Sequence, residues 1–105
     1  MDNDREILEL IKATARTYLP DAEVLLFGSR ARKDASPDSD YDILVITNLE
    51  LDLKQKLSLK TNIRKELLKS GVRSDILIQS RKEIKTKKRL PRHIIKNILN
   101  EAILL

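Results

Sequence analysis

The most constraining feature of the chain is a polar stretch held between two short apolar runs. Val24 to Phe27 precedes this stretch and Ile43 to Ile46 follows it. Apolar runs of this length, bounded by turn-forming residues, are typical of buried strands. Between them, residues 29–33 are compatible with a helix and residues 36–39 with a turn. The order strand, short helix, turn, strand therefore places polar groups at the ends of two buried strands.

The start of the stretch has the features of a phosphate-binding turn. Gly28 and Ser29 stand where a strand passes into a helix, so free backbone N–H groups and the helix dipole would point at a ligand in front of the helix. Gly28 has no Cβ to keep a ligand away from the backbone. A Gly-Ser pair after a strand is common, however, and alone it is weak evidence for phosphate binding.

The end of the stretch carries two carboxylates with strand spacing. Asp40 and Asp42 are two residues apart at the start of the second apolar run, so both point to one face, with their Cα atoms roughly 6–7 Å apart. Carboxylate oxygens placed like this suit Mg²⁺, which leaves further positions to water and substrate phosphates. An Asp-x-Asp near a turn is also a frequent solvated turn. The combination of both signals favours metal-assisted phosphoryl or nucleotidyl transfer.

These residues resemble the signature of a known enzyme superfamily. Gly28-Ser29-x-Ala31-Arg32, followed by Ser39-Asp40-x-Asp42 and an apolar strand, is similar to the DNA polymerase β-type nucleotidyltransferases, and the short chain is most similar to the minimal nucleotidyltransferases. The resemblance covers nearly the whole chain. One departure is Lys33, where many members have glycine.

The resemblance implies the members of the site. It implies two Mg²⁺ ions with ATP as the substrate, the metal held by Asp40, Asp42 and a third carboxylate from a later strand. Asp75 is the only acidic residue in VRSDILIQ, residues 72–79, and takes that third role, although a solvated strand end would also explain it. Gly28, Ser29 and Arg32 would bind the nucleotide. A solvated helix face is the alternative for all three cations of this helix, Arg30, Arg32 and Lys33.

The resemblance also implies a partner. Minimal nucleotidyltransferases are often antitoxins paired with a HEPN-domain toxin, so the implied reaction transfers AMP from ATP to a hydroxyl, in this case a tyrosine of that toxin, in a type VII-like system. Two alternatives stay open. The chain could be a catalytically idle antitoxin that acts by binding, or an RNA-binding module that uses the basic block, residues 81–92. A charge run of this kind is, however, usually a solvated or mobile segment.

Composition limits the other classes. The 105 residues fit one domain, 1–105, and a domain this small is often completed by a second subunit or a partner. The net charge of +5 favours anionic partners such as nucleotides, RNA or an acidic protein surface. The absence of cysteine excludes disulfides and cysteine-bound zinc. An acidic N-terminus and the lack of a run of about 20 apolar residues predict a cytoplasmic protein without a membrane contact.

Periodicity gives the remaining elements. Long helices are expected over residues 3–19 and 50–70, a short helix from the Gly-Ser turn to about residue 35, and a last helix that starts at Pro91. Strands are expected over residues 22–27, 41–47 and 72–79. Residues 102–105 could add a short edge strand. This order predicts an α/β (α+β) domain with a small mixed sheet flanked by helices. By resemblance, it is the polymerase β-like nucleotidyltransferase core. Tyr41 is expected to pack in the core, and His93 to lie on the last helix's surface.

Overall fold

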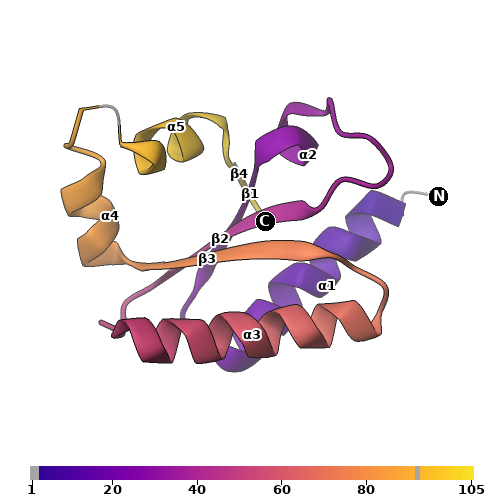
Figure 1. Cartoon of the computed structure of the whole chain (residues 1–105), viewed down its shortest axis with the longest axis horizontal. Coiled ribbons are helices and arrows are strands. Elements are labelled where there is room, and N and C mark those ends of the chain that lie inside the picture. The colour runs from indigo at the N-terminus through magenta and orange to yellow at the C-terminus, as the bar shows by residue number, and fades with distance from the viewer. Residues whose placement is uncertain (1–2, 92) are drawn as a thin grey trace.

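The computed structural model describes residues 3–91 and 93–105. Five helices and four strands follow one another in these residues (Figure 1): α1 Asn3–Tyr18, β1 Glu23–Phe27, α2 Gly28–Arg32, β2 Tyr41–Thr47, α3 Leu53–Lys69, β3 Ser74–Ser80, α4 Arg81–Lys87, α5 Ile94–Glu101 and β4 Ile103–Leu104. The strands form one sheet in the order β3-β2-β1-β4. β1 is antiparallel to β2 and β4, whereas β2 and β3 run parallel. The predicted mixed sheet flanked by helices is confirmed.

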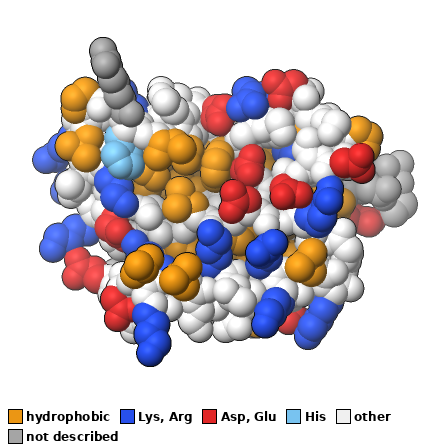
Figure 2. Space-filling model, viewed as in Figure 1, with side chains coloured by type: hydrophobic (Ala, Val, Ile, Leu, Met, Phe, Trp, Pro, Cys, Tyr) orange, Lys and Arg blue, Asp and Glu red, His pale blue; other side chains and the backbone are white. Residues whose placement is uncertain are grey.

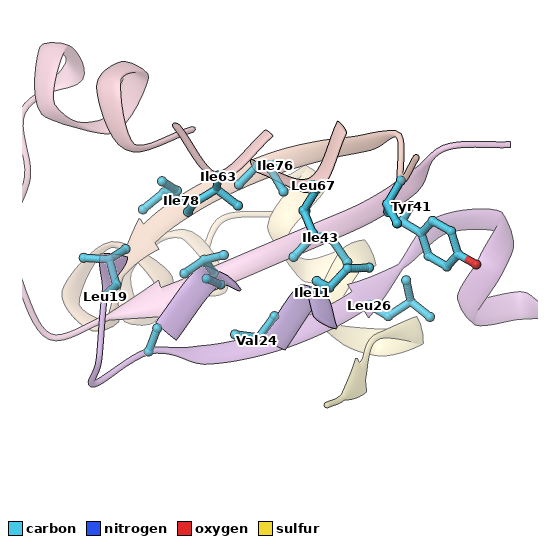
Figure 3. Packing of buried hydrophobic residues seen from close by; sticks show 14 residues of the cluster. Ile11, Leu19, Val24, Leu26, Tyr41, Ile43, Ile63, Leu67, Ile76 and Ile78 are labelled. Carbon is cyan, nitrogen blue, oxygen red and sulfur yellow. The ribbon is translucent and has the colours of Figure 1, made fainter. Parts of the chain in front are cut away.

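The sheet buries its two faces under different helices. On one face, alternate residues of the three long strands pack with α1 and α3 into the larger core, whose members include Ile11, Val24, Ile43, Ile63 and Ile76 (Figure 3). On the other face, Leu44 and Ile46 pack with Ile95 and Ile98 of α5. Tyr41 belongs to the larger core at 6% exposure, as expected. Because side chains alternate along a strand, Asp42 must point to the opposite face, toward α5.

Local signals set most of the element boundaries. β2 has the predicted bounds, since Ile, Leu and Val fill both faces of a central strand. The capping box of Asp52 and Gln55 starts α3. β4 forms inside the expected edge segment and pairs with β1. Among the described residues, no helix has the length and apolar character needed to cross a membrane.

Two helix predictions need correction. The short helix after Gly28 was expected to reach about residue 35, but it ends at Arg32 because Lys33 adopts a left-handed backbone with φ 63°. That conformation favours glycine, which explains why glycine suits this position. The last helix begins at Ile94 rather than at Pro91, and His93 is its N-cap, with Nδ1 accepting a hydrogen bond from the N–H of Ile95 at 3.1 Å.

The basic block contains a helix that was not predicted, although none of its helical residues is buried. Residues Arg81–Lys87 form α4, started by a capping box in which Ser80 and Glu83 bond reciprocally. Lys87 donates a hydrogen bond to Gln79 Oε1 at 2.6 Å, and Arg81 bonds to Glu23 and Asn48. Arg92, the last member of the block, lies outside the described residues.

Candidate active site

The candidate site lies where β1 ends and β2 and β3 begin. Asp42 is the second residue of β2 and Asp75 the second residue of β3, and the parallel register places them side by side. The antiparallel register places Phe27, the last residue of β1, beside Asp42. Gly28 follows directly and opens α2. The sheet thus brings together two of the predicted carboxylates and the Gly-Ser turn from three separate segments.

Gly28 and Asp42 fit against each other. Gly28 has φ +73°, and a Cβ at this position would lie 2.1 Å from Oδ2 of Asp42 and 3.0 Å from its Cγ. Any other residue would occupy the space that the Asp42 carboxylate fills. Glycine is therefore needed twice here, once for the left-handed backbone and once for the approach of the carboxylate.

The electrostatic environment of Asp42 disfavours its ionised form. Burial raises the pKa of the Asp42 carboxyl, and the negative charges of Asp75 and Asp40 raise it further, while Arg32 acts in the opposite direction. A half-buried carboxylate beside like charges is costly unless a cation compensates it. This arrangement is one that a divalent cation would stabilise.

The other two carboxylates are more open. The Asp40 carboxylate lies 3.4 Å from Nε of Arg73, and its side chain is 52% exposed. Asp75 is 68% exposed and lies 4.0 Å from the ammonium of Lys60. Within residues 3–91 and 93–105, no group of three acidic, His or Cys side chains is close enough to form a ready metal cage. The structure places the three carboxylates in one neighbourhood, with Asp40 held by Arg73.

A fourth carboxylate, which was not predicted from the sequence as part of the site, lies against the Gly-Ser turn. Oε1 of Glu101 accepts a hydrogen bond from the N–H of Gly28 at 3.1 Å, and Oε2 accepts one from Nη1 of Arg32 at 2.9 Å. Arg32 also donates to Asp34 at 3.2 Å. These contacts hold the pKa of the Glu101 carboxyl below its usual value, through Arg32 first and the Gly28 amide second. Two of the expected nucleotide-binding groups, Gly28 and Arg32, thus share an internal anionic partner.

The register of β4 could have revealed Glu101. Ile103 and Leu104 pair with Leu26 and Leu25 in antiparallel order. Continuing that register backwards brings the residue before Ala102 beside the residue after Phe27. The expected edge strand would have predicted this contact if its pairing with β1 had been assigned.

Arg30, a further cation near the turn, has structural contacts. Arg30 stacks on the ring of Tyr41, 4.3 Å from its centroid, and donates to the carbonyl of Ser39 at 2.8 Å. It therefore fixes the turn that leads to Asp40 rather than forming part of a solvated helix face. Ser29 is partly exposed as the second residue of α2.

Across the face shown in Figure 2, acidic side chains gather near the centre, with an apolar strip on one side and basic side chains below.

Comparison with known proteins identifies the family. The family model of the nucleotidyltransferase domain matches residues 7–105. The chain belongs to this family. A Methanocaldococcus jannaschii protein named "putative protein adenylyltransferase" is 30% identical over 103 residues, which cover 97% of this chain and 96% of the relative. The prediction of a nucleotidyltransferase is thereby confirmed.

Solved structures agree on the nucleotidyltransferase fold. A "putative minimal nucleotidyltransferase" shares 29% identity and a TM-score of 0.62, over 100% of this chain and 97% of the other. A toxin–antitoxin complex with AMP-PNP matches with a TM-score of 0.55 and 19% identity, over 98% of this chain and 72% of that one. The second likeness is one of fold. Both support the polymerase β-like core that the signature implied.

Proposed function

We propose that this nucleotidyltransferase is a single-domain, Mg²⁺-dependent enzyme that transfers AMP from ATP to a hydroxyl group of a protein. The observation that carries the proposal is the seating of the Asp42 carboxylate against Gly28, beside Asp75, at the start of two parallel strands. This unit joins the metal-binding and phosphate-binding halves of the signature. The adenylyltransferase relative supports AMP as the transferred group.

The acidic residues fit a divalent cation of the Mg²⁺ type. Asp40, Asp42 and Asp75 offer only carboxylate oxygens, the donors that Mg²⁺ prefers. Burial, followed by the negative charges of Asp75 and Asp40, raises the pKa of Asp42. Asp42, the most buried of the three, would be the central ligand. Asp40 would have to leave Arg73 to join it. When bound, two such ions neutralise phosphate charge and stabilise the attacking and leaving oxygens.

The turn after β1 would hold the triphosphate. The backbone N–H of Gly28, the hydroxyl of Ser29 and the guanidinium of Arg32 are hydrogen-bond donors close to one another on α2. Charge-assisted bonds of this type are strong and directional. They would orient the α-phosphorus so that its bond to the bridging oxygen lies opposite the incoming hydroxyl.

Asp75 would receive the proton of the attacking hydroxyl. Its side chain is exposed at the start of β3, so an acceptor can approach it from solvent. The acceptor oxygen would form a bond to the α-phosphorus as the bond to the β-phosphate bridge breaks, pyrophosphate would leave, and the hydroxyl proton would pass to the Asp75 carboxylate. Lys60 nearby limits the negative charge around that carboxylate.

The acceptor would be the tyrosine hydroxyl of a HEPN-type toxin, which AMP addition silences, and this chain would be the antitoxin. The exposed position of Asp75 suits an acceptor presented by another protein. A toxin–antitoxin complex holding AMP-PNP shares this fold. RNA binding through the basic block is less supported, because Arg81 and Lys87 bond within the chain.

The test is transfer of label from α-phosphate-labelled ATP, with Mg²⁺, to the co-expressed product of the neighbouring gene. The wild type should add one or more AMP groups to the partner, detected by mass, and the Asp40→Ala/Asp42→Ala variant should add none. Asp38→Ala, two residues before Asp40 in the turn, is the matched control and should retain transfer. Toxin inhibition that survives in the double variant without any mass increase would instead establish an antitoxin that acts by binding.

A further inference from the structure

Glu101 holds the donors that the proposed function assigns to phosphate. Its two oxygens accept hydrogen bonds from the Gly28 N–H and from Arg32, which lie 73 and 69 residues away in the sequence. The Glu101 carboxylate therefore lies in front of the turn and occupies these two donors. Carboxylate and phosphate oxygens use the same donors, so the two cannot fill these positions together.

The charges around Arg32 make the turn selective among anions. Arg32 already pairs with Glu101 at 2.9 Å and with Asp34 at 3.2 Å. One cation between two carboxylates attracts a further anion only weakly. A phosphate gains the full attraction of Arg32 only after Glu101 has released it.

We propose that Glu101 is a specificity-determining residue that acts as an internal stand-in for phosphate. It would exclude simple anions from the turn and yield only to a metal-bound triphosphate, which gains contacts at the carboxylates as well. This inference rests on the proposed function, since it assumes that phosphate binds at Gly28 and Ser29. Glu101 would thus compete with phosphate for the hydrogen-bond donors of the turn.

The surrounding packing indicates which part moves. Ile95 and Ile98 bury α5 against the sheet at 1% and 3% exposure. After Glu101, β4 pairs with β1, and the N–H of Leu105 donates to the carbonyl of Val24 at 2.8 Å. Because the backbone is anchored on both sides of Glu101, displacement needs only a rotation of its side chain.

The first experiment measures binding of inorganic pyrophosphate without metal, by calorimetry. Glu101→Gln keeps the shape but removes the charge, and should bind pyrophosphate about tenfold more tightly than the wild type, the order of one charge-assisted contact. Asp34→Asn is the matched control, because it removes the other carboxylate on Arg32 and leaves the Gly28 amide occupied. It should change affinity less than about threefold. Equal effects of the two variants, or weaker binding by Glu101→Gln, would overturn the proposal.

A second measurement uses the unaltered protein, in case Glu101→Gln folds poorly. Addition of Mg²⁺ and a hydrolysis-resistant ATP analogue should shift the carbon-13 resonance of the Glu101 carboxyl and the amide resonance of Gly28. Shifts at Gly28 and Ser29 with an unchanged Glu101 would refute the stand-in but leave the phosphate site intact. No shift at Gly28 or Ser29 would refute the proposed phosphate site itself, so the two failures are distinguishable.

Discussion

Replacing Gly28 by alanine should damage the site in two separable ways. The first is the left-handed backbone, φ +73°, which costs an L-residue roughly 1–2 kcal/mol. The second is the new Cβ, which would lie 2.1 Å from Asp42 Oδ2. A normal contact is longer than 3 Å, so the carboxylate would have to retreat by about 1 Å, a misplacement that can reduce a rate about a hundredfold.

The chain provides its own control for the backbone cost. Gly71 has φ +78°, and a Cβ there would have no heavy atom within 4 Å. Gly71→Ala should therefore lose about 1–2 kcal/mol of unfolding free energy and keep its transfer activity. Gly28→Ala should lose a further 1–3 kcal/mol or so from the forced contact.

The assay combines urea unfolding with a double-mutant cycle. In an Asp42→Ala background, the two closest atoms are gone and only the Cβ of residue 42 remains, 3.2 Å away. The excess cost of Gly28→Ala over Gly71→Ala should then largely vanish, which measures the coupling between the two positions. Transfer of AMP should fall about a hundredfold in Gly28→Ala alone. If Gly28→Ala were no less stable than Gly71→Ala and fully active, Asp42 would not depend on the glycine and the reasoning would fail.

Three further predictions follow from single contacts. Asp21→Asn should lower the free energy of unfolding by about 0.5–1.5 kcal/mol near neutral pH, because the hydrogen bond from the Asn48 N–H, 2.6 Å away, lowers the pKa of Asp21. This stabilisation is present above the pKa that Asp21 has in the unfolded chain and is lost as the pH falls through its lower pKa in the folded protein. A difference in urea midpoints that does not depend on pH would contradict it. Asp42→Asn should raise the melting temperature at neutral pH while abolishing transfer, because burial and then Asp75 raise the pKa of Asp42, so that its ionised form destabilises the fold. An unchanged or lower melting temperature would contradict this destabilisation. Ser80→Ala should cost about 1 kcal/mol through the loss of the α4 capping box, and a urea midpoint equal to that of the wild type would show that the cap is dispensable.

The strands were predictable because their side chains carry a local pattern. Apolar runs marked β1 and β2 as buried strands, and a third apolar run around Asp75 marked β3. Alternation alone then placed Tyr41 in the core and Asp42 on the opposite face. These are properties of neighbours in the chain, so no tertiary information was needed.

The missed features depended on weaker or more distant information. The Ser80 and Glu83 capping box was readable in the sequence, but the density of basic residues after it favoured a solvated segment. The left-handed conformation of Lys33 ends α2 early, and lysine gives no signal for it. Glu101 meets Gly28 only through the pairing of β4 with β1, a contact across most of the chain.

The candidate site lowers the stability of the folded protein, and this indicates its function. Asp42 is half-buried beside Asp75 and Asp40, so its ionised form opposes folding. Its seat also requires a glycine in a backbone region that other residues rarely adopt. A protein that acted only by covering a partner would gain stability from an uncharged residue at position 42 and would need no glycine against it. Beyond the nearby charge of Arg32, the arrangement would gain a compensating interaction if a cation and phosphates entered, which favours catalysis over binding alone as the reason these residues lie together.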